Sequence, residues 1–257
     1  MLALIKNTLK GLGTWILFFV LIFFFSNCRE THNKNEGVVK KETVLEEKEA
    51  VEQKEKDIKE RPSLEAYADT TFIRLADFSE DFSYDLRYAT KNNFLKAKVY
   101  PCAECYTRVK TARALIKANE EFKKYGFKIK FFDCYRPNAV QYKMWELVPN
   151  PQYVANPVKG SIHNKGGAVD ISLVTLSGQE VDMGTDFDFF GKRAYHDNVD
   201  LPKEILENRK LLKDIMEKNG FWSIRTEWWH YNLQGSSNEP VANFIWPCKD
   251  DSGNQKP

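Results

Sequence analysis

Histidine is scarce in this sequence, and its scarcity limits where a metal site can be built. Only four histidines occur among the 257 residues. His32 lies in a segment with few apolar residues, which leaves His163, His196 and His230 for any site in a folded domain. A single histidine is more often a turn or core residue than a ligand, so only a combined pattern with other ligand types indicates a metal.

The sequence also lacks a strong positive charge and a long apolar run, and these absences bear on nucleic-acid binding and on membrane spanning. The formal net charge is only +2, so the chain has no basic footprint for nucleic acid. The apolar run from Trp15 to Phe25 is shorter than the roughly 20 residues that a transmembrane helix needs. We therefore expect no nucleic-acid partner, and a permanent transmembrane anchor is the weaker interpretation of this run.

The amino terminus has the layout of an export signal. Lys6 and Lys10 precede the apolar run, and Phe25-Ser26-Asn27-Cys28 ends it in a pattern similar to a bacterial lipoprotein cleavage box. Residues 1–28 are thus predicted to form a signal segment, with a lipid on Cys28. We expect an exported protein, anchored by that lipid to a bacterial membrane and facing the periplasm.

Composition divides the rest of the chain. Residues 29–62 are rich in Glu and Lys and contain no aromatic residue, which predicts a solvated tether because ordering it would bury too little apolar surface. Residues 63–250 are long enough for one well-buried domain, and residues 251–257 are predicted to be a disordered tail.

Hydrophobic periodicity predicts grouped strands and helices in that domain. The fold class is therefore predicted to be α+β, with a central antiparallel sheet that carries the site and helices packed around it. The predicted strands are Phe82–Tyr88, Lys128–Tyr135 and Ala168–Leu173, and the predicted helices are Arg108–Tyr125, a short helix ending near Leu147, and Lys203–Asn219.

Four cysteines remain besides Cys28, namely Cys102, Cys105, Cys134 and Cys248. An even number in an exported protein indicates disulfides, but the pairing cannot be read from the sequence. A structural zinc held by all four thiolates is the less favoured alternative.

One strand is predicted to present a metal ligand. From Ala168 to Leu173 the residues alternate as in a half-buried strand, so Asp170 points from a rigid element. Gly166-Gly167 predicts a turn that brings His163 beside Asp170. With His230, these residues form a set of two imidazoles and one carboxylate, which is typical of a catalytic zinc with an open fourth position.

The pattern S-x-H-x-x-G-x-A-x-D over Ser161–Asp170, followed by E-W-W-H over Glu227–His230, resembles the VanX-type D-alanyl-D-alanine dipeptidases among the D-Ala-D-Ala zinc peptidases. The similarity extends from about Asp85 to Pro247 and includes Asp133-Cys134-Tyr135-Arg136-Pro137. It implies zinc-dependent hydrolysis of D-alanyl-D-alanine to two D-alanines.

The resemblance also implies the roles of individual residues. Positions matching His163, Asp170 and His230 hold one zinc per chain, the position matching Glu227 is the catalytic base, and the position matching Arg136 stabilises the transition state. Residues three apart on a regular strand face opposite ways, so Glu227 and His230 can share a site only if Glu227 lies in a bend or bulge.

Asp188, flanked by Phe187 and Phe189, is the candidate for binding the substrate ammonium group; the alternative is that Asp188 caps or braces its own loop. Two other functions remain open, a D,D-carboxypeptidase acting on peptidoglycan stem peptides and a non-catalytic zinc-bearing binding protein. An exported enzyme could not easily destroy the dipeptide in the cytoplasm, so we expect wall turnover or scavenging rather than glycopeptide resistance.

Overall fold

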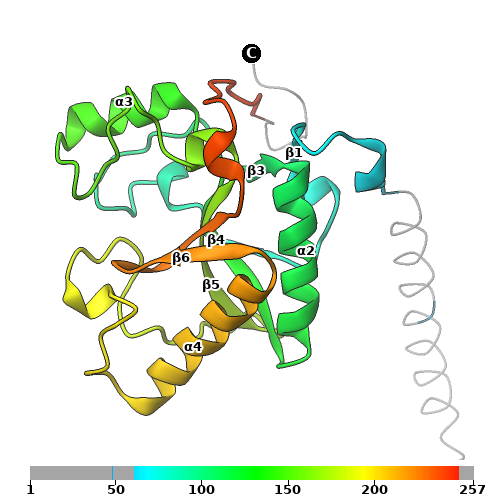
Figure 1. Ribbon diagram of the computed structural model, residues 1–257, viewed down its shortest axis with the longest axis vertical. Helices are drawn as coiled ribbons and strands as arrows, with labels where there is room; N and C mark the ends of the chain where they lie inside the picture. The colour runs from blue at the N-terminus through cyan, green and yellow to red at the C-terminus, as the bar shows by residue number, and fades with distance from the viewer. Residues whose placement is uncertain (1–47, 49–60, 249–257) are drawn as a thin grey trace, which may run out of the picture. The chain divides into compact units, whose positions relative to one another are not determined.

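The computed structural model describes Lys48 and residues 61–248 (Figure 1). The predicted signal segment at 1–28 and tail at 251–257 lie outside the described residues, as does the tether at 29–62 apart from Lys48 and its last two residues. Within the described part of the chain, no helix combines the length and apolar character needed to cross a membrane.

A five-stranded sheet forms the centre of the domain, in the order β2-β4-β5-β7-β6. Neighbouring strands run antiparallel, as predicted, except that β2 at one edge is parallel to β4. The strands are β2 (Ser83–Tyr84), β4 (Phe127–Asp133), β5 (Ala168–Thr175), β6 (Phe221–Ile224) and β7 (Glu227–Leu233). A second, two-stranded sheet pairs β1 (Phe72–Arg74) with β3 (Tyr106–Arg108).

Three helices occupy the predicted segments. They are α2 (Val109–Lys123), α3 (Asn138–Leu147) and α4 (Lys203–Lys218). Helices α2 and α4 pack against each other, and α2 packs against β4 while α4 packs against β6 (Figure 1). Gly126 and Gly220 follow α2 and α4 with φ values of 84° and 88°, a left-handed conformation that favours glycine and lets the chain turn into β4 and β6.

The prediction of a strand over Phe82–Tyr88 is wrong for most of its length. Only Ser83–Tyr84 pair with β4, and a 3-10 turn follows at Arg87–Ala89. The chain leaves the sheet because Asn93 closes a loop, donating from its side-chain amide to the carbonyls of Arg87, Thr90 and Ala97. These bonds join residues only three to six positions apart, but they leave no trace in the alternation of apolar residues.

The strand β5 is more deeply buried than its alternating pattern predicts. Every residue from Ala168 to Val174 is buried, so the half-buried interpretation is wrong. Val169, Ile171 and Leu173 belong to the hydrophobic core, while Asp170 on the other face is only 4% exposed. The polar face is covered by loops, which sequence periodicity does not register.

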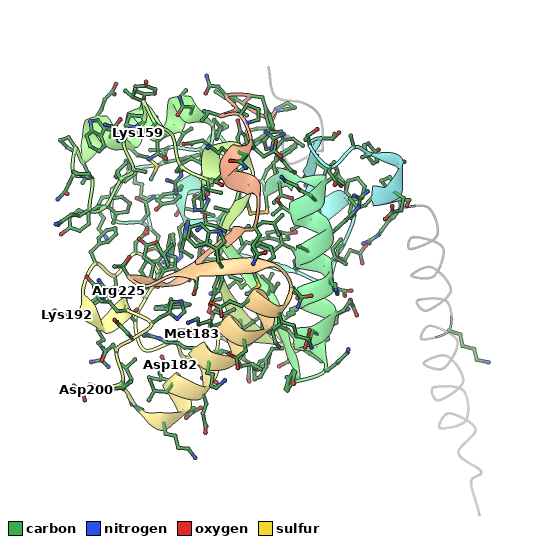
Figure 2. The ribbon with its side chains drawn as sticks, viewed as in Figure 1. Lys159, Asp182, Met183, Lys192, Asp200 and Arg225 are labelled. Carbon is green, nitrogen blue, oxygen red and sulfur yellow. A yellow bond between two sulfur atoms is a disulfide. The ribbon has the colours of Figure 1, made fainter. Side chains whose placement is uncertain are left out.

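The loop that follows β5 is held against α4. Arg209 donates from Nε to the Met183 carbonyl (2.7 Å), and Asn208 donates to the Asp182 carbonyl (3.0 Å). Figure 2 shows Asp182 and Met183 lying beside this helix. The loop therefore has a fixed start, and it leads directly to Asp188.

Two disulfides use the four cysteines of the domain. Cys102 pairs with Cys248, and Cys105 pairs with Cys134. The alternative of a structural zinc held by these four thiolates is therefore wrong. The second disulfide ties the end of β4 to the residue that precedes β3.

Candidate metal centre

Three candidate ligands converge at one end of the sheet. Asp170 on β5 and His230 on β7 are direct partners in the antiparallel register, and His163 lies in a 3-10 turn (His163–Lys165) just before β5. The Asp170 Oδ1 atom is 2.9 Å from His230 Nδ1 and 3.4 Å from His163 Nε2. One ligand atom from each residue lies within 4.8 Å of the others, so the set predicted from sequence is assembled.

The double glycine before β5 makes this convergence possible. Gly166 has a φ of 71°, and a Cβ there would lie 2.3 Å from the Phe72 ring. A Cβ on Gly167 would lie 2.1 Å from the Cβ of Ser236. Larger residues would therefore push the turn outward and carry His163 away from Asp170.

The hydrogen bonds of the two imidazoles leave one nitrogen of each ring free to bind a metal ion. His163 Nδ1 is 2.7 Å from the Cys134 carbonyl oxygen, and His230 Nε2 is 3.0 Å from Asn232 Oδ1. Both oxygens can only accept, so these ring nitrogens must carry the protons. His163 Nε2 and His230 Nδ1, 3.2 Å apart, then direct lone pairs at the same point as the Asp170 carboxylate. Such converging lone pairs fit a divalent cation, and the outer oxygens are the partners that orient metal-binding imidazoles.

Electrostatics keep Asp170 available as a charged ligand. Burial by itself would raise the pKa of Asp170, but His163 and His230 outweigh it and hold that pKa well below its usual range. In the other direction, burial would lower the pKa of His230, while the hydrogen bond and charge of Asp170 raise it. The pair is therefore mutually stabilised in its charged form until a cation takes the place of the proton.

Glu227 lies beside the three candidate ligands but is not one of them. Its Oε2 is 3.9 Å from His230 Nδ1, and it is not part of the converging group. The predicted irregularity is present: after Ser223 pairs with Tyr231, Ile224 pairs with Glu227, so β7 contains extra residues at this point. Burial raises the pKa of Glu227, with a further contribution from Asp170. This carboxylate has the placement and basicity of a general base.

Arg136 is fixed from two sides at the end of β4. It donates from Nε (3.1 Å) and Nη2 (2.6 Å) to Asp133 Oδ2 and from Nη1 to Gln141 Oε1 (2.9 Å). Its Cζ lies 5.2 Å from the centre of the Tyr88 ring. Burial would lower the pKa of Arg136, but Asp133 raises it well above its usual value, so the guanidinium remains charged.

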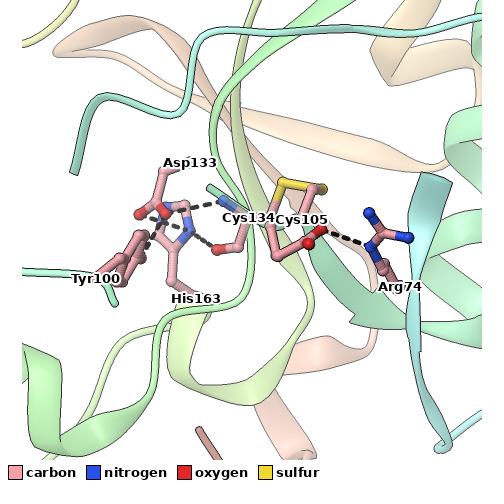
Figure 3. The surroundings of a disulfide bond; sticks show 7 residues. Arg74, Tyr100, Cys105, Asp133, Cys134 and His163 are labelled. Atoms are coloured by element: carbon pink, nitrogen blue, oxygen red, sulfur yellow. Dashed lines mark hydrogen bonds and ion pairs between the residues drawn. A yellow bond between two sulfur atoms is a disulfide. The ribbon is translucent and has the colours of Figure 1, made fainter. Parts of the chain in front are cut away.

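The supporting residues of Arg136 were not identified from the sequence. Asp133 also accepts hydrogen bonds from the Tyr100 hydroxyl (2.5 Å) and from the Cys134 amide (2.9 Å) (Figure 3). Its position three residues before Arg136 was visible in the motif, but the contact with Tyr100 is made across 33 residues. Asn232 lies two residues after His230 and hence on the same strand face, so the sequence spacing could have predicted its contact with His230.

Asp188 faces the same cavity. The Tyr88 hydroxyl donates to both of its carboxylate oxygens, at 3.2 Å and 3.0 Å. The residue has a φ of 60°, a left-handed conformation that is uncommon outside glycine. Burial and then the Asp170 charge raise the pKa of Asp188 well above its usual value. These bonds hold the carboxylate at the cavity and also brace the loop of Asp188 against Tyr88, so they fit both of the roles expected from the sequence.

The tryptophans between Glu227 and His230 are buried. Trp229 lines the cavity of the metal ligands, and Trp228 donates from Nε1 to the Thr185 hydroxyl (2.8 Å). That bond braces the loop leading to Asp188. His196, the third histidine available to a folded domain, is not part of the converging group. It packs near Tyr231, whose side chain lies on the other face of β7 from that of His230.

The cavity at the ligands has a volume of about 330 Å³ and is lined by His163, Asp170, Glu227, His230 and Arg136, among others. An adjoining cavity of about 420 Å³ shares Tyr153, Phe190 and Glu227 with it. A larger cavity of about 630 Å³, lined by Lys130, Ser172 and Glu180, contains none of the ligands. The site is therefore identified by its converging ligand atoms and not by the volume of its cavity.

Known proteins resemble this chain over the same region. The family model described as D-ala-D-ala dipeptidase matches residues 68–247. The D-alanyl-D-alanine dipeptidase of Escherichia coli (strain K12) is 34% identical over 191 residues, which cover 73% of this chain and 98% of that protein. That of Enterococcus faecium is 31% identical over 204 residues, which cover 69% and 98%. A solved vancomycin resistance D,D-pentapeptidase in complex with Zn(II) aligns with 51% of this chain and 75% of its own, at 15% identity and a TM-score of 0.36.

Proposed function

Because the chain belongs to the D-ala-D-ala dipeptidase family, we propose that it hydrolyses D-alanyl-D-alanine to two D-alanines with a bound zinc ion. The observation that carries the proposal is the set of His163, Asp170 and His230 with Glu227 beside it but outside it. A set of three protein ligands leaves a coordination position open, as catalytic rather than structural zinc sites do.

We propose one zinc per chain. His163 Nε2, Asp170 Oδ1 and His230 Nδ1 would hold it, since these are the atoms whose lone pairs converge. When bound, zinc polarises the scissile carbonyl and lowers the pKa of a water molecule towards 7.

Glu227 performs the proton transfers. Its carboxylate accepts the proton of the attacking water and then delivers that proton to the amine of the leaving D-alanine. Its raised pKa suits both steps, because a more basic carboxylate takes a proton more readily and still releases it to an amine. A side chain that does not titrate, such as the amide of glutamine, could do neither.

Arg136 stabilises the negative charge that develops on the carbonyl oxygen. A guanidinium has five N–H donors, and three of those of Arg136 are used by Asp133 and Gln141. The two that remain, one on Nη1 and one on Nη2, are held in a fixed direction by the three that are bonded. A single well-aimed donor of this kind can be worth about 2.7–4 kcal/mol in the transition state.

Asp188 binds the free ammonium group of the dipeptide. Its carboxylate faces the cavity beside Tyr88, and a bound ammonium would favour its charged form. A substrate whose amine is acylated would leave that buried acceptor without a partner. Polar sites reject analogues strongly for this reason.

Acylation of the substrate is therefore expected to lower kcat/KM by at least about a hundredfold, or about 2.7 kcal/mol. The measurement compares D-alanyl-D-alanine with its N-acetylated form and with a pentapeptide that ends in the same pair. In Asp188→Asn, we expect slower cleavage of the free dipeptide and a much smaller difference between the substrates. Equal rates on free and acylated compounds would support the D,D-carboxypeptidase alternative and leave the zinc chemistry intact.

The non-catalytic alternative is a binding protein that keeps an idle zinc site. The presence of both Glu227 and Arg136 beside the ligands argues against it, since neither is needed to hold the metal. Release of D-alanine above the rate without enzyme decides between the two.

We further propose that the protein is exported and anchored to a bacterial membrane by a lipid on Cys28, facing the periplasm. The support is the short apolar run that ends at Cys28 and the charged segment behind it. In that location the enzyme would act in wall turnover or scavenging of the dipeptide.

Mature protein extracted from membranes is expected to begin at Cys28 and to carry lipid there. Mass spectrometry of the intact protein and of its amino-terminal peptide measures both features. An unprocessed Met1, or a product cleaved at another residue, would contradict the anchoring proposal without affecting the chemistry of the site.

A further inference from the structure

Two consecutive residues at the end of β4 support both halves of the site. The Cys134 carbonyl accepts the Nδ1–H of His163 (2.7 Å), which leaves His163 Nε2 free to bind metal. The neighbouring Asp133 carboxylate holds Arg136 through two hydrogen bonds and lies 3.7 Å from His163 Nδ1. A displacement of this short segment would therefore disturb the metal ligand and the arginine together.

A disulfide fixes this segment to a separate part of the fold. Cys134 is bonded to Cys105, with a Cα–Cα distance of 5.4 Å, and both side chains are buried. Cys105 is itself anchored, because its carbonyl accepts the Leu75 amide (2.9 Å) and the adjacent Glu104 binds Arg74 on β1 (2.5 Å). The small β1–β3 sheet thus serves as the fixed support to which the end of β4 is tied.

The peptide group after Cys134 is constrained at both of its ends. Its carbonyl accepts from His163, and its N–H, which belongs to Tyr135, donates to the Tyr106 carbonyl on β3 (2.9 Å). The disulfide adds a covalent restraint through the side chain of Cys134. The orientation of the His163 ring therefore depends on a segment held by β3 and by Cys105.

We propose that the Cys105–Cys134 disulfide is a positioning element of the metal centre and makes zinc affinity and turnover depend on thiol oxidation. The inference rests on the proposed zinc site. A dithiol reductant would transfer two electrons and two protons to the S–S bond, giving two cysteine thiols and an oxidised reductant. The end of β4 would then lose its covalent restraint, and the Cys134 carbonyl and the Asp133 carboxylate would sample positions less suited to His163 and Arg136.

The second disulfide provides a matched control. Cys102 and Cys248 are separated by 146 residues, against 29 for Cys105 and Cys134. In the chain-entropy model a longer closed loop stabilises the fold more, so removing the Cys102–Cys248 bond should harm global stability at least as much. Removing Cys102–Cys248 is therefore expected to lower the stability of the fold at least as much as removing Cys105–Cys134. Removing Cys105–Cys134 is expected to weaken zinc binding more.

The experiment compares the full-length wild type with the double variants C105A/C134A and C102A/C248A. Zinc dissociation constants are measured by competition with a chelator, and thermal unfolding is followed without metal. We expect C105A/C134A to bind zinc about tenfold more weakly or worse, the range typical of lost outer-shell support, with a lower kcat and little change in KM. We expect C102A/C248A to stay within about twofold of wild type in zinc affinity, whatever its midpoint of unfolding.

A second measurement covers the case in which C105A/C134A does not fold. Folded C102A/C248A protein is treated with a dithiol reductant, and free thiols are counted alongside the zinc dissociation constant. Appearance of two thiols should coincide with weaker zinc binding. Unchanged zinc affinity after reduction, or equal losses in both double variants, would overturn the positioning role. Absence of zinc binding in the wild type would instead contradict the proposed function.

Discussion

Replacing Glu227 by glutamine is expected to lower kcat by about three orders of magnitude or more while the protein keeps its fold and its zinc. General base catalysis contributes up to about 10⁴-fold, and an amide of the same shape cannot accept the proton. Zinc should remain because Glu227 is not among the converging ligand atoms. The fold should remain because burial already raises the pKa of this carboxylate, so a neutral isostere is well tolerated there.

The measurement combines kcat for D-alanyl-D-alanine with the zinc content of the same sample. Glu146→Gln, on the exposed side of α3, is the matched control and should behave as wild type. Loss of zinc from Glu227→Gln would mean that Glu227 is a ligand. Retention of near wild-type kcat would mean that another group moves the proton.

Removing the metal is expected to abolish hydrolysis, and returning zinc should restore it. The reason lies in the donor set, because His163 Nε2 and His230 Nδ1 would be left facing Asp170 and each other without a cation. The metal-free protein should stay folded, since the hydrophobic core and both disulfides do not depend on the ligands. Circular dichroism of the chelated protein checks that the loss of rate is not a loss of structure.

Local sequence signals predicted the helices and the strand that presents Asp170. The apolar spacing in Val109–Lys123 and Lys203–Lys218 follows from packing on one side of each helix, and a glycine ends each of them. Asp170 on β5 and the turn before it could be predicted because the alternation and the two glycines are local properties. The irregularity at Glu227 was predictable by geometry, since two groups three apart must both reach one cavity.

Contacts between distant segments could not be predicted in the same way. The pairing of Cys105 with Cys134 depends on the approach of β3 to the end of β4, for which spacing gives no sign. A local feature was missed as well: the loop closed by Asn93 replaces most of the strand expected over Phe82–Tyr88, although the apolar alternation favoured that strand. The identity of the backbone carbonyl that orients His163 is likewise fixed only by tertiary structure.

The most direct test of the central claim is a zinc titration of metal-free protein, with release of D-alanine from D-alanyl-D-alanine measured at each step. The account predicts that activity rises in proportion to added zinc and levels off at about one ion per chain, because His163, Asp170 and His230 form one site. Full activity before any zinc is added, or no activity at saturating zinc, would contradict it.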